Sequence, residues 1–294
     1  MKKPSNNSLI IILIILSVLL GGGISPLAKT ALKQLSPENF TFIRFGISSI
    51  FILPFFLKQK TGIRKELLKL IPMSLLLTIN VLLFAYGVRL TTADIGQILY
   101  VLVPIIVLIL SHFLLQDKIS LPKLLGIVLG VTGAFLVIAL PLIEGSKFSG
   151  NLFGNLLIIT AIISFSFYTV FSKRFQKKYT PIEITLVASL TTSVSMLILS
   201  IPELPKFINQ LPNLSNLTIF AVIYLGIGGT AATYGLYQYI MKLSSATTAS
   251  TILYLQPLAT IVWAYFLLSE KLTTGFVIGG LLAIAGTIIV TRYK

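Results

Sequence analysis

The feature that most constrains this chain is an apolar segment that occurs twice, once in each half of the sequence. Residues 93–137 fall on residues 246–290 of the stretch 246–292 when the first segment is shifted by 153 positions. The matched positions include a mid-helix proline, an acid-lysine pair and two glycines: Pro104 with Pro257, Asp117-Lys118 with Glu270-Lys271, Gly126 with Gly279 and Gly133 with Gly286. A chance match between apolar segments would rarely align all of these in one register. The chain therefore contains an internal repeat, which has to be identified before a fold is assigned.

Long apolar runs separated by short polar links indicate a membrane protein. Hydrophobic residues make up 55% of the 294 residues and charged residues only 11%, whereas soluble domains carry roughly 25% charged residues. The runs are about 20 residues long, as a membrane-spanning helix requires, and they lack the alternation of spanning strands. About ten spans are expected, at residues 8–28, 37–57, 67–88, 93–115, 120–141, 151–172, 182–201, 216–241, 246–268 and 273–291.

The first apolar run begins soon after Lys2 and Lys3, as in a secretory signal peptide. It continues through Gly21-Gly22-Gly23 to Leu27 without a convincing cleavage site, so we expect a membrane helix that stays in the mature chain. Lys and Arg gather in alternate links, which by the positive-inside rule places both termini in the cytoplasm. This distribution explains the net charge of +15 with the lipid bilayer as partner and no nucleic acid.

The repeat extends upstream of the matched segment. Ser36-Pro37 matches Thr180-Pro181 at a shift of 144 positions, and the longer polar link at 202–215 absorbs the difference between the two shifts. Spans one to five therefore repeat as spans six to ten, so two repeats are expected at residues 1–145 and 146–294.

Because each repeat has five spans, which is an odd number, the two copies cross the membrane in opposite directions. The expected fold class is an all-α integral membrane protein with ten transmembrane helices in two inverted five-helix repeats. In proteins of this architecture the substrate site lies near mid-membrane between the halves.

A motif that occurs in both copies resembles a known family. A central proline is followed by Phe-Leu-Leu, an acidic residue, Lys and a glycine-spaced helix, as Pro104…FLLQDKIS…Gly126…Gly133 and Pro257…FLLSEKLT…Gly279…Gly286. Together with Arg44-Phe45 in the second span and Ser166-Phe167-Tyr168 in the sixth, this motif resembles the EamA family of the drug/metabolite transporter superfamily.

The resemblance covers nearly the whole chain. It implies export of small metabolites or amino acids across the cell inner (plasma) membrane. It also implies a central cavity lined mainly by spans one, three, four, six, eight and nine. Two positions depart from the family pattern: Asp117, where Glu is more frequent, and Gly21-Gly22-Gly23, where many members carry a bulkier segment.

Polar side chains inside the spans are the first candidates for substrate binding, because such groups are costly in a membrane. Spacings of three and four place Asn80 with Phe84, and Gln97 with Tyr100, on common helix faces. An aromatic pocket with few amides suits a small amphiphilic ligand; the alternative is that these residues bridge neighbouring helices. The expected substrate-binding residues are Asn80, Phe84, Gln97, Tyr100, Tyr168, Tyr234, Tyr237, Gln238, Ser250 and Tyr254.

Arg44 lies about 7 residues, or ~10 Å, inside the second span. Three interpretations remain open for this side chain. It extends outward to water, it forms an outer gate with Asp94 at the outer end of the fourth span, or it meets an anionic group of the substrate.

The paired prolines and glycines have structural interpretations as well. Pro104 and Pro257 each free a carbonyl one turn earlier, and either act as hinges or fix a static kink. The rows Gly126-xxx-Gly130 and Gly279-xxx-Ala283 allow close helix packing, and a homodimer through this face is a further expectation.

Titratable groups are nearly absent from the span interiors. No Asp or Glu falls in the middle of a span, and His112 has Tyr265 as its repeat partner, which favours a structural role. Because proton coupling usually needs an intramembrane carboxylate or histidine, facilitation or exchange is expected, with sodium coupling through carbonyls left open. The chain has no cysteine and one histidine, so neither a metal nor another cofactor is expected.

These features favour a secondary transporter that exports a small-molecule substrate, with amino acids or related amphiphilic compounds first, by alternating access of the repeats. The alternative is an organic-anion or sugar-phosphate exchanger of the same superfamily. That exchanger would need several intramembrane Lys or Arg, and only Arg44 qualifies. No enzyme is expected, since the spans contain no paired carboxylates, Ser-His pair or metal-ligand cluster. A channel or scaffold is the remaining class, and conductance in bilayers distinguishes it.

Overall fold

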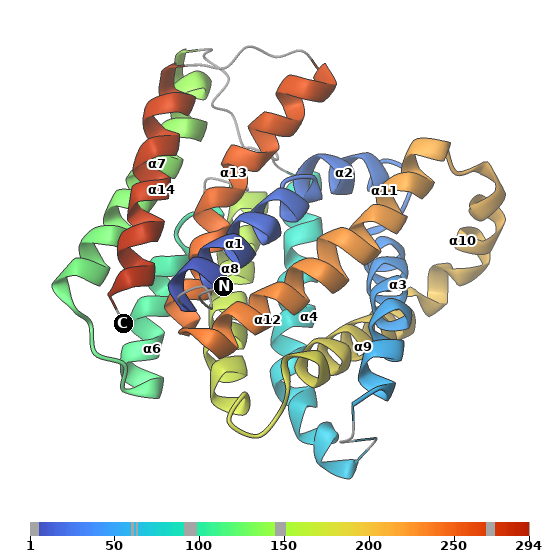
Figure 1. Cartoon of the computed structure of the whole chain (residues 1–294). Coiled ribbons are helices and arrows are strands. Elements are labelled where there is room, and N and C mark those ends of the chain that lie inside the picture. Colours follow the sequence, from blue (N-terminus) through green and yellow to red (C-terminus); the bar gives the residue numbers. More distant parts are fainter. Residues whose placement is uncertain are drawn as a thin grey trace.

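Helices account for nearly all of the residues that the computed structural model describes, which are 6–59, 62, 64–90, 99–144, 151–268 and 274–293. The first half contains α1 (Asn6–Gly21), α2 (Ile24–Ala31), α3 (Pro37–Leu57), η1 (Lys65–Leu70), α4 (Ile71–Leu90), α6 (Val103–Leu115) and α7 (Leu121–Glu144). The second half contains α8 (Leu152–Phe175), α9 (Pro181–Ser200), η2 (Ile201–Glu203), α10 (Leu204–Gln210), η3 (Leu211–Asn213), α11 (Asn216–Gly226), η4 (Ile227–Ala232), α12 (Thr233–Leu243), α13 (Ala246–Leu268) and α14 (Thr274–Arg292). Figure 1 shows their arrangement.

These elements confirm the expected fold class. The chain is an all-α integral membrane protein with ten transmembrane segments in two inverted five-helix repeats. Within the described residues, six helical segments are long and apolar enough to cross a membrane by length and composition, and shorter apolar helices lie at 103–115, 121–136 and 277–292. Where the structure describes them, the expected spans coincide with these helices, with α1–α2 as the first span and α11–η4–α12 as the eighth.

The same local chemistry starts the second helix of each repeat. Ser36 caps α3 by accepting a hydrogen bond from the backbone N–H of Asn39, and Pro37 follows in the first turn. Thr180 caps α9, where the carboxylate of Glu183 accepts in return from the Thr180 backbone N–H. A serine or threonine cap with proline in the first turn fixes where a helix begins, so the repeated sequence produces the repeated helix start.

Helix packing follows the approximate two-fold symmetry of the repeats. α3 packs on α9 and α7 on α14, so equivalent helices of the two copies meet. The contact of α4 with α8 has its counterpart in the contacts of α11 and α12 with α2 and α1. In Figure 1, α7 and α14 stand side by side at one edge of the molecule, and α3, α10 and α11 lie at the other.

The glycine rows pack within the chain. A Cβ added at Gly286 would lie 2.6 Å from the Gly130 backbone nitrogen, and one added at Gly126 would lie 3.0 Å from the Gly286 carbonyl oxygen. Side chains at these positions would hold α7 and α14 apart. The rows therefore serve this intramolecular contact, and the expected homodimer stays a prediction.

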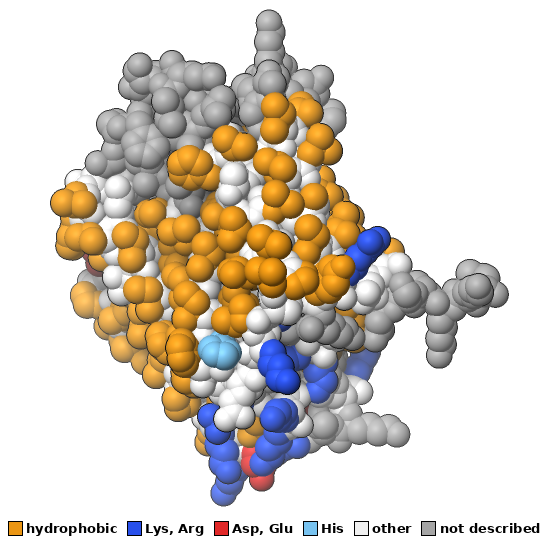
Figure 2. Space-filling model, turned by 90° about the vertical axis from the view of Figure 1, so that its left-hand side faces the viewer, with side chains coloured by type: hydrophobic (Ala, Val, Ile, Leu, Met, Phe, Trp, Pro, Cys, Tyr) orange, Lys and Arg blue, Asp and Glu red, His pale blue; other side chains and the backbone are white. Residues whose placement is uncertain are grey.

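The outer surface fits a lipid environment. Figure 2 shows hydrophobic side chains over most of the face that it displays, with Lys and Arg gathered below them. Large apolar side chains such as Ile50 and Phe113 are each 73% exposed. We call the end where α8 and α12 finish the basic end of the bundle, because Lys173, Lys177 and Lys242 lie there.

Three spans depart from a regular α-helix. The first span breaks at Gly22-Gly23. The fourth breaks at Val101-Leu102, so that Pro104 lies in the first turn of α6, whereas Pro257 lies inside the continuous α13. The eighth contains η4, a π-helical segment. These irregular segments all adjoin the central cavity described next.

Candidate functional site

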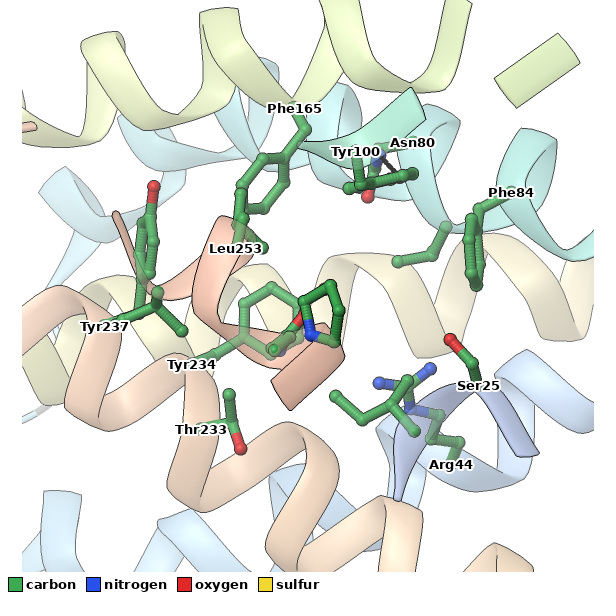
Figure 3. A pocket seen from close by; sticks show the side chains of 15 residues that line it. Ser25, Arg44, Asn80, Phe84, Tyr100, Phe165, Thr233, Tyr234, Tyr237 and Leu253 are labelled. Carbon is green, nitrogen blue, oxygen red and sulfur yellow. Dashed lines mark hydrogen bonds between the residues drawn. The ribbon is translucent and has the colours of Figure 1, made fainter. Parts of the chain in front are cut away.

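A cavity of about 100 Å³ lies between α2, α3, α4, α8, α12 and α13. Its walls are mainly apolar and aromatic, with a few polar side chains among them (Figure 3). The lining residues are Ile24, Ser25, Arg44, Asn80, Val81, Phe84, Tyr100, Phe165, Thr233, Tyr234, Tyr237, Ile252, Leu253, Gln256 and Pro257. Because drug-sized ligand sites occupy roughly 300–1,000 Å³, this space suits a small metabolite.

The lining consists largely of residues that the repeat relates. A shift of 153 positions converts the lining residues of the third and fourth spans into those of the eighth and ninth: Asn80 into Thr233, Val81 into Tyr234, Phe84 into Tyr237 and Tyr100 into Leu253. The approximate two-fold axis therefore passes through the cavity, where inverted-repeat transporters place their substrate.

Asn80 and Tyr100 form a fixed polar pair at one wall. The Asn80 amide nitrogen donates to the Tyr100 hydroxyl (2.5 Å) and to the Ala161 carbonyl on α8 (2.8 Å). The Phe84 ring meets the Tyr100 ring edge-on, with 5.2 Å between centroids. The amide thus bridges helices, as one sequence interpretation had it, and lines the cavity at the same time.

Arg44 is buried, with 5% of its surface exposed, so the interpretation that it extends outward is wrong. Its Nε donates to the Thr230 hydroxyl (2.6 Å) and its Nη2 donates to the Gly229 carbonyl oxygen (3.2 Å). Both partners belong to η4, and a π-helical turn alters the regular i to i−4 bonding of the backbone. The π-helical segment therefore presents the Gly229 carbonyl and the Thr230 hydroxyl to Arg44.

Close packing brings Arg44 to this position. A Cβ added at Gly226 would lie 2.6 Å from the Ile47 side chain and 3.2 Å from the Arg44 carbonyl oxygen. Only glycine lets α3 approach the eighth span so closely. Gly226 therefore serves close packing, while Gly229 of the same span supplies a hydrogen-bond acceptor.

Aromatic rings form the opposite wall. Phe165 on α8 has its ring centroid 5.7 Å from that of Tyr237 and 6.5 Å from that of Tyr234. The Tyr237 hydroxyl is hydrogen-bonded to Thr169 (3.1 Å). Figure 3 shows Arg44 beside Ser25 at one side of the cavity and Tyr237 at the other.

Five of the expected substrate-binding residues line the cavity, and four others of the described chain lie outside it. Asn80, Phe84, Tyr100, Tyr234 and Tyr237 belong to the lining, as do Arg44 and Pro257. Tyr168, Gln238, Ser250 and Tyr254 are not among the lining residues. Gln97 and Asp94 fall outside the described residues, and their expected roles stay predictions.

The four residues outside the cavity have partners elsewhere. The Tyr254 ring fills the space beside Gly130 and its hydroxyl accepts from Thr287, so it joins α13 to α7 and α14. Ser250 donates to the carbonyl of Thr247 in its own helix. Tyr168 and Gln238 are bonded to each other (3.0 Å).

A hydrogen-bonded latch closes the space between α8 and α12 at the basic end. We define it as Tyr168, Thr169, Ser172, Gln176, Tyr237 and Gln238. Gln238 donates to Tyr168 (3.0 Å) and Ser172 (3.1 Å), and accepts from the Gln176 amide (2.8 Å). Below it, Lys173 donates to the carbonyls of Met241 and Ser244, where a cation is favourable at a helix C-terminus.

Several lining residues were not among the expected ones. They are Ile24, Ser25, Val81, Phe165, Thr233, Ile252, Leu253 and Gln256. The repeat pairs Thr233 with Asn80 and Leu253 with Tyr100. Thr233 and Leu253 could therefore have been expected in the lining, because their repeat partners were. Nothing in the sequence distinguishes Ile24 or Phe165 from lipid-facing residues.

Comparison with known proteins agrees with this geometry. The model of the EamA-like transporter family matches residues 8–139 and again residues 152–292. The chain belongs to the EamA-like transporter family. An uncharacterized transporter of Archaeoglobus fulgidus is 28% identical to this EamA-like chain over 91% of the chain and 95% of the relative.

Other relatives give the same result. The uncharacterized transporter YoaV of Bacillus subtilis is 26% identical to this EamA-like transporter, over 88% of each chain. A solved crystal structure shares its fold, with a TM-score of 0.78 at 18% identity over 97% of this chain and 98% of that one. These comparisons identify a multi-pass membrane transporter and leave its substrate open.

Proposed function

We propose that this EamA-like chain is a secondary transporter of the plasma membrane that exports small amphiphilic metabolites by alternating access. The observation that carries the proposal is a central cavity lined by repeat-related residues and latched at one end. In such a transporter the two inverted repeats exchange conformations, so that the site opens to one side and then to the other. The basic end is the cytoplasmic end, with both termini there, by the positive-inside rule.

The asymmetry between the two ends favours this mechanism. The repeat-equivalent positions of all six latch residues carry apolar or small residues: Ile24 for Tyr168, Ser25 for Thr169, Ala28 for Ser172, Leu32 for Gln176, Phe84 for Tyr237 and Ala85 for Gln238. Within the described residues these positions form no hydrogen bond between side chains of α2 and α4. The contact of α8 with α12 is therefore held by polar side-chain bonds, while the equivalent contact of α2 with α4 is made by apolar and small side chains.

Amino acids or related amphiphilic compounds are the first substrates to test. Phe84, Phe165 and Tyr237 give the cavity an apolar, aromatic wall for a hydrocarbon or aromatic side chain. Polar groups of Arg44, Ser25 and Gln256 remain for the polar end of the substrate. Such a mixture of a large apolar wall and few polar groups is typical of small-molecule sites.

The second candidate is an organic-anion exchanger of the same superfamily. Arg44 favours it, because a buried cation on the cavity wall attracts an anion. A sugar phosphate is a weaker fit, since Arg44 is the single Lys or Arg among the lining residues and phosphate esters favour several cationic contacts.

Counterflow in proteoliposomes tests the proposal with a panel of amino acids, monocarboxylates and phosphate esters. Asn80→Leu removes two hydrogen bonds at the wall and is expected to lower uptake at least about tenfold, given about 1 kcal/mol for each bond. Asn216→Leu, at an exposed position at the start of α11, is the matched control and should leave uptake unchanged. Conductance without counterflow, or failure of the whole panel, would contradict a transporter of this kind.

A further inference from the structure

We infer that Arg44 binds a carboxylate of the substrate, and that the transported species is a monocarboxylate anion with an apolar tail. This inference rests on the proposed function and selects, among its candidate substrates, the organic anion over the amino acid. On this inference, recognition requires the carboxylate of the substrate and does not require a positively charged amino group. The expected substrate is therefore a simple anion and differs from a zwitterionic amino acid.

The burial of Arg44 among neutral partners favours an anionic binding partner. Placing an isolated charge in an apolar environment costs several kcal/mol unless the charge is paired. This cost applies to Arg44, because only 5% of its surface is exposed. Its two hydrogen-bond acceptors, the Thr230 hydroxyl and the Gly229 carbonyl, are both neutral. The Phe45 ring lies 5.5 Å from the guanidinium carbon and adds a weak attraction.

No carboxylate among the described residues compensates this charge. The ion pair found there joins Arg64 to Glu183 near the basic end, and the cavity lining contains neither Asp nor Glu. A guanidinium has five N–H donors, and the two bonds to η4 use Nε and Nη2. The rest of the fork is available to the cavity that Arg44 lines.

The surroundings of Arg44 suit a carboxylate. Guanidinium groups bind carboxylates through two parallel N–H···O bonds, which are stronger than neutral hydrogen bonds. Ser25 lies beside Arg44 in Figure 3 and adds a hydroxyl donor. Phe165 and Tyr237 lie across the cavity from Arg44 (Figure 3), so a bound monocarboxylate places its tail against aromatic rings.

The repeat shows that this charge is specific to one copy. Arg44 corresponds to Ala188 at the shift of 144 positions, and η4 corresponds to part of the regular helix α4 at the shift of 153. The cavity is therefore symmetric in its apolar lining and asymmetric in charge. An ammonium group finds no acidic partner among the lining residues, which is why the zwitterion gains nothing over the anion.

Binding to the purified full chain in detergent tests the inference apart from transport. The probes are 4-methyl-2-oxopentanoate, its uncharged amide, and leucine, which share one carbon skeleton. The oxo acid is expected to bind at least about tenfold more tightly than its amide, because only the anion gains the charge-assisted bonds. Leucine is expected to bind no more tightly than the oxo acid.

Variants assign the carboxylate to Arg44. Arg44→Met should abolish the preference for the acid over the amide, and Arg44→Lys should keep part of it. Arg89→Met, at an exposed arginine at the end of α4, is the matched control and should bind as the unchanged protein does. Asp94→Asn should also leave binding unchanged; a loss there would replace the inference with an Arg44–Asp94 ion pair.

Equal binding of acid and amide to the unchanged protein would overturn the inference even if Arg44→Met fails to fold. Tighter binding of leucine than of the oxo acid would overturn the anion as the substrate class. Acid-selective binding without counterflow would refute the proposed transporter and leave the Arg44 site intact, so the two failures are distinguishable.

Discussion

Gln238 is the residue on which the latch at the basic end depends most. Its side chain takes part in three hydrogen bonds, with Gln176, Tyr168 and Ser172, and it is fully buried. Replacing it with leucine keeps the approximate volume and removes all three. At about 0.6 kcal/mol for each side-chain bond in a membrane bundle, the closed basic end loses about 2 kcal/mol.

This loss should shift the conformational equilibrium toward a state that is open at the basic end. Since 1.4 kcal/mol corresponds to a tenfold change, about 2 kcal/mol corresponds to roughly a 20- to 30-fold shift. The bonds join α8 to α12, and these helices have to separate for the cavity to open at this end. The substitution therefore destabilises the state that is closed at the basic end and leaves the free energy of the open state unchanged.

Cysteine labelling measures this shift directly, because the natural chain contains no cysteine. Val81→Cys places a thiol of similar size in the cavity wall. In vesicles with the basic end facing a membrane-impermeant maleimide, Gln238→Leu should raise the labelling rate roughly 20- to 30-fold, in proportion to the open population.

A matched control separates this effect from a general loosening of the protein. Gln210→Leu makes the same chemical change and removes a hydrogen bond to the Gln34 carbonyl (2.6 Å), far from the basic end. It should leave the rate unchanged. A rise of less than about threefold in Gln238→Leu, or an equal rise in both variants, would refute the latch, because the three bonds would then be worth much less than the value used.

Two further predictions concern stability. Gly286→Val should lower the melting temperature in detergent by several degrees, since its Cβ would lie 2.6 Å from the Gly130 backbone and overpacking costs about 1–3 kcal/mol. The control is Gly235→Val, whose Cβ meets nothing within 4 Å and which should have a much smaller effect. Equal melting temperatures of the two variants would contradict the packing role of Gly286. Thr180→Ala removes the cap of α9 and should lower the free energy of unfolding by about 1 kcal/mol, as measured with denaturant. The control is Thr160→Ala, which removes an exposed hydroxyl that is bonded within its own helix. An equal loss of stability in both variants would argue against the cap.

The architecture could be predicted from the sequence because it depends on patterns that are local or repeated. Apolar runs of membrane length predict helices, since the backbone has to satisfy its own hydrogen bonds in lipid. Ser36-Pro37 and Thr180-Pro181 marked the starts of α3 and α9 for the same reason in both copies. An odd number of spans per copy then requires the inversion.

The site could be predicted only in part. Asn80 and Tyr237 could be selected from the sequence because polar groups inside a membrane span are costly and therefore indicate function. Both line the cavity. Tyr254 looked equivalent in sequence. Its ring instead packs beside Gly130 between α7 and α14, because the helix presents that face to its neighbours, and periodicity alone does not specify which face meets which helix.

The sequence by itself therefore determined the membrane environment, the ten spans, the inverted repeat and some of the residues that line the cavity. The tertiary structure decided where Arg44 points, which residues form the latch, and that the glycine rows join α7 to α14. The physical reason is that these features depend on contacts between helices far apart in the chain. The bond between Arg44 and Thr230 spans 186 residues, and the π-helical carbonyl at Gly229 exists as a partner only after the two repeats have packed together.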